Sequence, residues 1–495
     1  PFLVIEPAKG EYKNFFGHLP DVSVYSTNPN KYNLIRINPF SFPPYVHILE
    51  HMDRLVEIFN VCWPMYAAMP AILKEAMERA YTVSGWDITA SINSKGEVFP
   101  NFSDLLEHIE AVINESPYSA ESKGDYSGAL CTRVRSLTNG LNGLILRNDE
   151  LSAAELFDKN VIVDLSRVGS AETKSLLMGL LVMKLNEYRM ASGKFNSPLS
   201  HITVLEEAHN LLKRTPTEQS SEGANLLGKS VEMLANSIAE MRTYGEGFII
   251  ADQSPGLLDM SVIRNTNTKI ILRLPEQSDR ELVGLAACLN EDQIKELAKL
   301  ERGVAAVYQN DWVEAVLVKV SKCELEEKTY ENIADTKRAD ISVIRQQMTF
   351  LLIQGRVSER LTFDVEKIEH NLDILGLPTR TREFFEEQIA EFKASGKLLL
   401  WRDDKLGKLS HHLTEFLGFR RQVENCVFTS ADNAELTSHL TNIVKRFIPA
   451  ASKEIILTIS QCAMKALSAG QDESEIRKRI YMQWVESIKV GVVKL

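Results

Sequence analysis

Short apolar runs alternate with helical patterns along much of the chain. Each run has four or five residues, the length of a strand buried inside a sheet. After residue 165, leucines recur at helical spacing. Strands that alternate with helices predict an α/β fold with a mostly parallel, doubly wound sheet, in which ligands bind at the carboxyl ends of the strands. The runs are FLVI (2–5), VSVY (22–25), VIVDL (161–165), ITVL (202–205), FIIA (248–251) and IILRL (270–274).

Two other stretches are mainly helical. Between residues 39 and 150 the strand pattern weakens, and a strong helical periodicity is interrupted by two prolines. Residues 304–318 predict two strands about an Asn-Asp turn, a hairpin that would close the sheet at one edge. Beyond about residue 325 the pattern is helical and charged. We therefore predict an α/β core at 1–38 and 151–325, a helical insertion at 39–150 and a mainly helical C-terminal domain at 326–495.

The composition is that of a soluble globular protein, with 44% hydrophobic and 25% charged residues. No apolar run approaches the length of a membrane span and no signal segment is recognisable, so we expect a cytoplasmic protein with no membrane partner. The six cysteines lie far apart without C-x-x-C spacing, which predicts reduced, mostly buried thiols and no zinc site. A formal charge of −11 means that any contact with DNA must come from a local patch or from a ring of loops.

Residues 223–230, GANLLGKS, match the pattern of a phosphate-binding loop, G-x-x-x-x-G-K-[ST]. Such a loop needs a hydrophobic strand immediately before its first glycine, because the strand end aims backbone N–H groups at the phosphates. Here the preceding residues are KRTPTEQSSE, which is a polar stretch. We interpret the match as accidental and predict a solvated loop leading into a helix that begins near Lys229.

An acidic pair has a better context for nucleotide chemistry. The run ITVL ends in Glu206 and Glu207, the arrangement of a Walker B strand. The first acid would hold Mg²⁺ at the phosphates, and the second would orient or deprotonate the attacking water. The next strand, FIIA, ends at Asp252 and Gln253, and an amide there is placed to sense a γ-phosphate. The alternatives are an exposed acidic strand end that caps a helix, and a strand-end glutamine with ordinary hydrogen bonds.

Taken together, five stretches resemble the HerA/FtsK superfamily of hexameric DNA-pumping P-loop ATPases, and its HerA branch most closely. The resemblance covers roughly residues 1–320 and implies a RecA-like P-loop ATPase core with ATP and Mg²⁺ as cofactors. It also implies that the true phosphate loop lies upstream of Pro1, so that this chain is a fragment cut inside a larger protein. The stretches are VIEPAKGEY (4–12), VIVDLS (161–166), TVLEEAHNLL (203–212), AEMRTYGEGFIIADQSP (239–255) and VIRNTNTKIILRL (262–274).

The chain departs from the family pattern at two positions. The family usually has Asp-Glu at the Walker B tip, whereas this chain has Glu206 followed by Glu207. The side chain of glutamate is one methylene longer than that of aspartate, so the first carboxylate lies further from the backbone. This difference weakens the match of Glu206 to the family's metal ligand. The family's glutamine is commonly followed by Arg-Pro, whereas Gln253 is followed by Ser254 and Pro255.

Further roles follow from the resemblance. Arg242 matches an arginine that acts on the nucleotide of a neighbouring subunit, with Arg264 and Arg273 in reserve; the alternative is a surface ion pair. The residues expected beside the nucleotide are Glu6, Lys9, Glu11 and Arg264. For Glu6, Lys9 and Glu11 a salt bridge or loop cap is the competing interpretation.

DNA contacts are expected from a loop after the Walker B strand. Residues 211–229 carry Lys213, Arg214 and Lys229, and six copies in a homohexamer would form a positive collar around double-stranded DNA; a merely solvated loop is the alternative. The leading hypothesis is an ATP-driven DNA translocase or helicase that works with a nuclease or other effector, in DNA-end processing or anti-phage defence. Competing hypotheses are an ATP-binding ring scaffold that activates an effector, and a conjugation or secretion motor.

Overall fold

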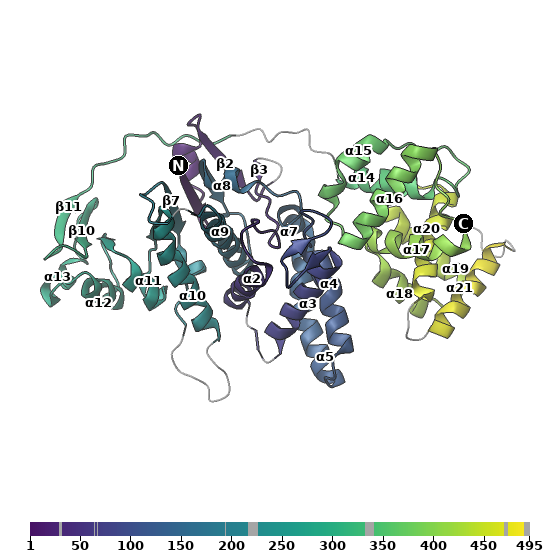
Figure 1. Ribbon diagram of the computed structural model, residues 1–495, viewed down its shortest axis with the longest axis horizontal. Coiled ribbons are helices and arrows are strands. Elements are labelled where there is room, and N and C mark those ends of the chain that lie inside the picture. Colours follow the sequence, from purple (N-terminus) through teal and green to yellow (C-terminus); the bar gives the residue numbers. More distant parts are fainter. Residues whose placement is uncertain are drawn as a thin grey trace. The chain divides into compact units, whose positions relative to one another are not determined.

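A parallel sheet of six strands forms the centre of the first half of the protein (Figure 1), which confirms the predicted α/β core. The strand order is β3-β2-β6-β1-β7-β8, so β1 lies between β6 and β7. Leu3 pairs with Val161 on one side and with Thr203 on the other. The strands are β1 (Phe2–Glu6), β2 (Val22–Ser26), β3 (Asn33–Leu34), β6 (Asn160–Asp164), β7 (His201–Glu206) and β8 (Glu246–Ala251).

The computed structural model describes residues 1–28, 32–63, 65–66, 68–193, 195–215, 226–331, 341–469 and 474–489. The chain divides into two compact units, Pro1–Thr336 and Lys337–Leu495. Among the described residues, every helix is too short or too polar to span a lipid bilayer.

One face of the parallel sheet is buried under a thick helical layer. The alternate residues Leu3, Ile5 and Leu205 belong to one large core with α2 (Ile48–Cys62), α9 (Ala171–Ala191) and α10 (Leu226–Glu240). Helix α9 is buried on most of its circumference, as expected for a helix between a sheet and a second helical layer. Gly179 allows the close approach of α2, because a Cβ there would lie 3.0 Å from Ile58.

The stretch between residues 39 and 150 contributes to this same core rather than forming a separate one. Its helix α4 begins with a capping box in which Asn101 and Asp104 each accept a hydrogen bond from the other's backbone N–H. The remaining elements there are α3 (Met69–Val83), β4 (Trp86–Asp87), β5 (Ile92–Asn93), α4 (Phe102–Glu115), α5 (Ala120–Tyr126), a π-helical turn η1 (Ser127–Cys131), α6 (Thr132–Thr138) and α7 (Gly140–Ile145), with α8 (Ala153–Phe157) following.

The other face of the sheet is covered more thinly. Val4, Val24 and Ile162 form a small cluster with Tyr330, which returns from the end of the first unit to this face. The short helix α1 (Tyr12–Phe16) packs here as well. Ile249 of β8 pairs with Val204 and so lies on the same face, where it is 52% exposed. The half of this face over β7 and β8 is therefore apolar and open to solvent.

A second, antiparallel sheet contains Ile270 and Ile271, the start of the run 270–274 that was predicted to lie in the parallel sheet. Strand β9 (Thr268–Ile271) pairs with β10 (Val304–Gln309), which forms the expected hairpin with β11 (Val316–Lys319). The prediction that this hairpin closes the parallel sheet is wrong. β9 has only one buried face, with Ile270 65% exposed and Ile271 buried, whereas a strand of a parallel sheet is covered on both faces.

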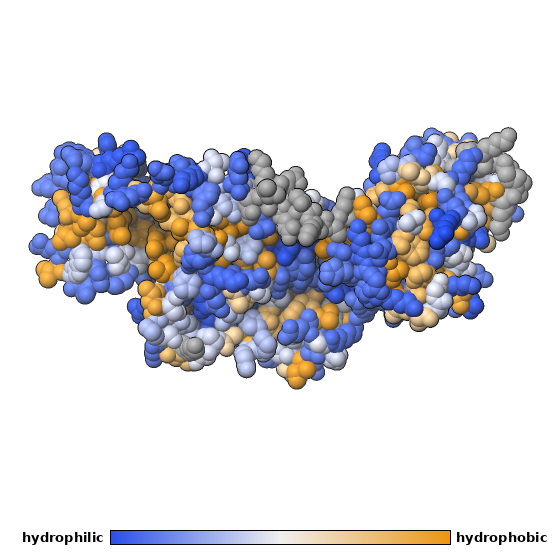
Figure 2. Space-filling view, turned by 90° about the horizontal axis from the view of Figure 1, so that it is seen from above, coloured by the Kyte–Doolittle hydropathy of each residue, from blue (hydrophilic) through white to orange (hydrophobic). Residues whose placement is uncertain are grey.

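The antiparallel sheet has its own small core with α12 (Gln277–Ala286) and α13 (Glu291–Glu296). Several apolar side chains of this part are exposed, including Ile270 of β9, Leu285 of α12 and Leu317 of β11. Figure 2 shows apolar surface at its left end. Two short elements, η4 (Pro255–Leu257) and α11 (Met260–Asn265), connect β8 of the parallel sheet to this part, and η3 (Met241–Tyr244) lies between α10 and β8.

All six cysteines are free, as predicted, but only Cys62, Cys131 and Cys462 are buried. Cys288 and Cys323 are exposed, so the expectation of mostly buried thiols holds for half of them. Both exposed thiols lie in or beside the small antiparallel unit, whose core is too thin to cover them.

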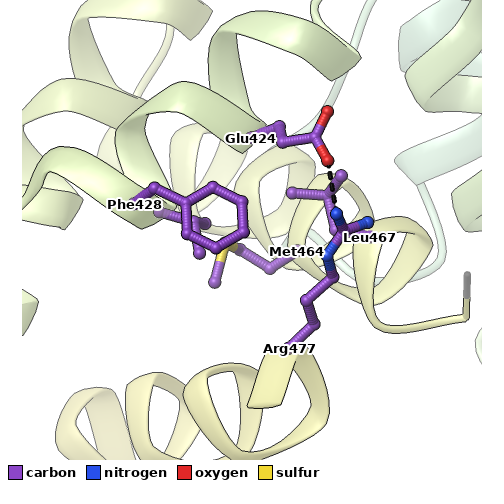
Figure 3. Close-up of a pocket in the computed structure, with 6 residues that line it drawn as sticks. Glu424, Phe428, Met464, Leu467 and Arg477 are labelled. Atoms are coloured by element: carbon purple, nitrogen blue, oxygen red, sulfur yellow. Dashed lines mark ion pairs between the residues drawn. The ribbon is translucent and has the colours of Figure 1, made fainter. Parts of the chain in front are cut away.

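The second unit is a helical bundle with a separate core. Trp484 is almost fully buried and donates its indole N–H to Thr437 over 3.0 Å. Figure 3 shows a small pocket in this unit, where Arg477 pairs with Glu424 at 2.7 Å beside Phe428 and Met464. The pocket has a volume of about 10 Å³, enough for a single water. The helices are α14 (Ile341–Ile353), α15 (Val365–His370), η5 (Leu372–Leu375), α16 (Thr379–Ser395), α17 (Asp403–Leu417), α18 (Arg420–Thr429), α19 (Asn433–Phe447), α20 (Lys453–Ser468) and α21 (Ser474–Lys489).

Candidate nucleotide site

Acidic residues end three adjacent strands of the parallel sheet, and a fourth follows the next strand. Glu6 ends β1 and is paired in register with Asp164 at the end of β6. Glu206 ends β7 opposite Ala251, which is followed by Asp252. Because the strands are parallel, these carboxyl ends meet at one edge of the sheet. The expected acids therefore share the edge where ligands bind in α/β sheets.

Glu6 is buried and shapes the loop after β1. Its Oε1 accepts the backbone N–H of Glu11 at 2.7 Å, and its Oε2 accepts that of Tyr12 at 3.3 Å. Burial raises the pKa of Glu6 to about 7, although the two backbone N–H groups act in the opposite direction. The predicted neighbours Lys9 and Glu11 are exposed beside it, and Lys9 has a left-handed φ of 62°.

Helix α1 holds the ends of two strands. The hydroxyl of Tyr12 donates to Oε1 of Glu206 over 2.5 Å. Lys13 forms an ion pair with Asp164, whose side chain is fully buried and also accepts the N–H of Ser166 at 2.9 Å. Burial, together with the bond to Glu206, raises the pKa of the Tyr12 hydroxyl, so this hydroxyl remains a donor. Tyr12, Lys13 and Asp164 were not among the predicted site residues, although the acid that follows the apolar residues 161–163 was a visible signal.

Gly10 makes the close approach of α1 possible. It has a left-handed φ of 72°, and a Cβ at this position would lie 2.7 Å from Nζ of Lys13 and 3.3 Å from Oδ1 of Asp164. A side chain here would collide with the ion pair. Glycine is therefore required by both the turn and the packing.

The second acid of the pair adopts an unusual backbone conformation. Glu207 lies in the left-handed region, with φ 44° and ψ 51°, directly after β7 and before the short turn η2 (Ala208–Asn210). Its carboxylate lies 3.5 Å from Nδ1 of His209. The same ring nitrogen lies 2.8 Å from Oδ2 of Asp252, and the backbone N–H of His209 donates to that oxygen at 2.9 Å. Strain of this kind persists where surrounding contacts hold it, often at functional sites.

Glu207, His209 and Asp252 offer ligand atoms that lie within 4.8 Å of one another. Carboxylate oxygens are ligands that Mg²⁺ prefers, and Mg²⁺ in nucleotide sites takes only one or two of them beside phosphates and waters. The partly exposed carboxylate of Glu206, at the open end of β7, fits this pattern. The donor set at this edge is therefore compatible with Mg²⁺.

The predicted sensor and arginines lie in different places. Gln253 follows β8 at the edge that carries the acids and is exposed. Arg242 is exposed in η3, before the first residue of β8, and so lies at the opposite edge of the sheet. Six strand residues separate the two edges by about 20 Å. Arg242 therefore does not join the carboxylates of its own subunit.

The reserve arginines also lie apart from the acids. Arg264 is exposed in the last turn of α11, and Arg273 donates from Nε to the carbonyl of Ala298 at 3.0 Å. Neither arrangement brings a guanidinium to the strand ends by itself.

The proposed DNA loop is only partly described. Lys213 and Arg214 are exposed, and their backbone pairs with that of Leu257 and Leu258. Residues 216–225, which include Gly223 of the GANLLGKS motif, lie outside the described residues. Lys229 is exposed on the first turns of α10.

The described part of GANLLGKS has the geometry of a helix. α10 already begins at Leu226, earlier than the predicted start near Lys229. Ser230, the residue that would face Mg²⁺ in a phosphate loop, is buried and donates to Glu57 of α2 instead. The segment also precedes β8 and follows β7, so it lies downstream of the acidic pair.

Comparison with known proteins agrees with this geometry. No protein-family model matches the chain. The chain is 30% identical over 300 residues to the DNA double-strand break repair helicase HerA of Sulfurisphaera tokodaii, which covers 58% of this chain and 54% of that protein. It is 31% identical over 124 residues to the protein of the same name from Sulfolobus acidocaldarius, covering 25% of this chain and 23% of that protein. The chain thus spans about half, or less, of the length of these curated relatives.

The fold is also similar to that of a solved structure, VirB4 of Thermoanaerobacter pseudethanolicus. The TM-score is 0.50 at 17% identity, and the match covers 65% of this chain and 82% of that one. At this identity the likeness concerns the fold. The strand-end acids and the sequence similarity to HerA proteins support the resemblance of this chain to the HerA/FtsK superfamily of P-loop ATPases.

Proposed function

We propose that this protein is an ATP-driven translocase or helicase acting on double-stranded DNA, working as a homohexameric ring with ATP and Mg²⁺. One observation carries the proposal: Glu206 ends β7 and Glu207 follows it, next to Gln253 after the neighbouring β8, and Tyr12 of α1 holds Glu206 while His209 contacts Glu207. The HerA relatives are named as DNA repair helicases, which supports the substrate class.

Each residue has a role in this proposal. Mg²⁺ with ATP supplies the electrophilic phosphorus and neutralises phosphate charge. Glu206 binds the metal, Glu207 orients the attacking water and accepts its proton, and Gln253 contacts the γ-phosphate. Arg242 acts in the site of the neighbouring subunit, and its place at the edge of the sheet opposite the acids supports this role over one in its own site. Other contacts to the nucleotide come from Glu6, Lys9, Glu11 and Arg264.

The thinly covered face of the sheet supports a place for the phosphate-binding helix. Ile249 is half exposed there, and its register partner Val204 is only partly buried. A helix packed on this face would bury both side chains. A phosphate loop ahead of β1, as the resemblance implies, would bring its helix to this position and its backbone N–H groups to the edge with Glu206.

The remaining parts of the proposal concern partners. Lys213, Arg214 and Lys229 are exposed on segments that flank residues 216–225, and in six copies they would line a pore for duplex DNA. A nuclease or other effector is the proposed protein partner, in DNA-end processing or anti-phage defence, in the cytoplasm.

A scaffold function is the second candidate. The helical unit Lys337–Leu495 has its own core, which suits a docking platform for an effector. In that case ATP binding would assemble the ring, and turnover would not respond to DNA. A conjugation or secretion motor, a related branch of the family that the sequence resembles, is the third candidate.

The test is DNA-stimulated ATP hydrolysis by the full-length protein and by Glu207→Gln. We expect duplex DNA to stimulate turnover, chelation of Mg²⁺ to abolish it, and Glu207→Gln to reduce it by at least about 100-fold while ring assembly is retained. Glu97→Gln, which changes an exposed carboxylate far along the chain, is the matched control. ATP turnover at the wild-type rate in Glu207→Gln would refute the catalytic role of Glu207. A rate of turnover that is the same with and without duplex DNA would favour the scaffold function.

A further inference from the structure

His209 lies between two carboxylates from neighbouring strands. Its Nδ1 is 2.8 Å from Oδ2 of Asp252 and 3.5 Å from Oε2 of Glu207. The Asp252 side chain is 3% exposed, compared with 16% for Glu207 and 27% for His209. The imidazole is therefore the contact between the end of β8 and the end of β7 at this edge.

The hydrogen-bonding pattern assigns the proton on the ring. Both neighbours of Nδ1 are carboxylate oxygens, which accept and do not donate, so Nδ1 carries the hydrogen. Oδ2 of Asp252 receives this donor together with the backbone N–H of His209, and Oδ1 receives the N–H of Ser254 at 2.9 Å. Asp252 thus fixes the loops that follow both β7 and β8.

The backbone around Glu207 shows why such a link is needed. A residue other than glycine is strained in the left-handed region, so Glu207 stays there only if its surroundings hold it. The carbonyl of Glu207 accepts the backbone N–H of Asn210 at 2.9 Å and its side-chain amide at 2.8 Å. The bond from the His209 backbone to Asp252 ties this turn to β8.

We propose that His209 and Asp252 form a positioning pair that couples the end of β8, where Gln253 lies, to the orientation of the Glu207 carboxylate. The inference rests on the proposed role of Glu207 in hydrolysis. When Gln253 contacts the γ-phosphate, any shift of β8 moves the adjacent Asp252, and the imidazole transmits that shift to Glu207. Neither residue touches the nucleotide, so both act through Glu207.

The same three side chains have the spacing of a metal site, which is the main alternative. In that case Asp252 would exchange at least one of its N–H donors for the ion. Both of its oxygens are already engaged by N–H groups, which favours the hydrogen-bonded link. The experiment includes a direct test for metal binding.

The test compares variants of the full-length protein at each position of the pair. His209→Ala removes the donor, whereas His209→Asn places an amide N–H close to where Nδ1 lies. Asp252→Asn keeps the shape but replaces one acceptor by a donor, which opposes an existing N–H. Readouts are kcat and KM for ATP, affinity for a non-hydrolysable ATP analogue, and hydrogen exchange in residues 207–212.

We expect His209→Ala and Asp252→Asn each to lower kcat by about tenfold or more, the effect of losing a charge-assisted hydrogen bond. KM and analogue affinity should change less than about twofold, His209→Asn should recover most of kcat, and the double variant should be no worse than the worse single one. Exchange in residues 207–212 should increase in His209→Ala and Asp252→Asn and return towards wild type in His209→Asn.

Several outcomes would overturn the inference. Additive losses in the double variant would mean that the two residues act independently. Parallel losses in KM, analogue affinity and melting temperature would indicate a structural role alone. Mn²⁺ binding in the absence of nucleotide, measured by calorimetry and abolished by His209→Ala, would assign a metal site instead. If Glu207→Gln is inactive but His209→Ala has normal turnover, the coupling fails while the proposed function stands; if Glu207→Gln is fully active, the proposed function itself fails.

Discussion

The hydroxyl of Tyr12 donates a hydrogen bond of 2.5 Å to Oε1 of Glu206, joining residues that are 194 positions apart in the chain. Tyr12 begins α1, directly after the loop that Glu6 holds through two backbone N–H groups. The bond sets the direction of one carboxylate oxygen of Glu206 and leaves the other for a metal ion. It is thus a restraint on the proposed metal ligand, and α1 supplies it.

Tyr12→Phe should impair hydrolysis without unfolding the protein. Removal of the hydroxyl frees the Glu206 carboxylate to rotate, and water can replace the lost donor because the site is only partly buried. We expect kcat to fall by roughly tenfold and the Mg²⁺ concentration for half-maximal turnover to rise, with a change of less than about 1 kcal/mol in the free energy of unfolding. Steady-state ATPase assays across Mg²⁺ concentrations measure both quantities. Tyr45→Phe makes the same chemical change at an 86% exposed position, and equal turnover in the two variants would contradict the prediction.

Burial of Glu6 should make the stability of the first unit depend on pH. Its pKa is about 7 in the folded protein, above the ordinary value of 4.5, because burial disfavours the charged form. The folded state therefore binds the proton more tightly than the unfolded state. This contribution to stability is fully present below pH 4.5 and is lost as the pH rises through 7, at up to about 1.4 kcal/mol per pH unit between the two values.

Denaturant unfolding followed by hydrogen exchange in β1 would measure this effect. We expect wild type to lose stability from pH 5 to pH 8 and Glu6→Gln, which does not ionise, to lose much less. Glu11→Gln alters an exposed carboxyl in the same loop and should behave like wild type. A slope in Glu6→Gln that matches wild type would place the pH dependence elsewhere.

The parallel sheet was predictable because its strands carry apolar residues on both faces and therefore appear as unbroken apolar runs. Glu206 and Glu207 were predicted for the same reason: they interrupt such a run at the end where ligands bind. The run at 270–274 has the same appearance locally, yet Ile270 and Leu272 are exposed and β9 belongs to an antiparallel sheet. A short apolar segment does not reveal which partner strand covers it.

The contacts that hold the site were not predictable from local patterns. Lys13 and Asp164 are 151 positions apart, and His209 and Asp252 are 43 apart, so each pair depends on which strands are neighbours in the sheet. The left-handed backbone of Glu207 has no signal in residue type, since glycine is the usual residue there. The GANLLGKS match shows the converse, because its last residues fit a motif and form a helix.

The cations beside residues 216–225 should determine the salt dependence of DNA binding. The slope of log K against log salt concentration, where K is the association constant for DNA, changes by about −0.9 for each phosphate that a cation neutralises. Removing three cations should therefore make the slope less negative by up to about 3 for each subunit that contacts the DNA. Fluorescence anisotropy of duplex DNA at several salt concentrations gives the slope. The test variant carries alanine at Lys213, Arg214 and Lys229, and the control carries alanine at Lys295, Lys299 and Arg302. An unchanged slope in the test variant would remove these cations from the DNA interface.

Breaking the buried ion pair between α2 and α9 should destabilise the protein strongly, whereas replacing both residues by apolar ones should destabilise it much less. His51 and Glu187 have fully buried side chains, with Nδ1 of His51 3.0 Å from Oε1 of Glu187, and Arg54 lies 3.4 Å from the same oxygen. Burial alone would raise the pKa of Glu187, but the charge of His51 and its hydrogen bond, helped by Arg54, outweigh burial and lower it. The stabilisation from Glu187 is therefore present above pH 4.5 and is lost as the pH falls through the depressed value.

Glu187→Leu leaves His51 buried without its partner, which should cost about 3–5 kcal/mol of unfolding free energy. The double variant His51→Phe with Glu187→Leu removes both charges and fills the space with apolar groups, so it should recover most of that loss. Urea unfolding at pH 7 measures both, and Glu172→Leu, an exposed position in the first turn of the same helix, is the matched control. If the double variant is as unstable as Glu187→Leu, the pair contributes through shape and hydrogen bonds that apolar residues do not reproduce. If Glu187→Leu lowers the free energy of unfolding no more than the control does, the ion pair adds nothing to the packing of α9 against α2. The apolar contacts around Gly179 and Ile58 would then hold the two helices together.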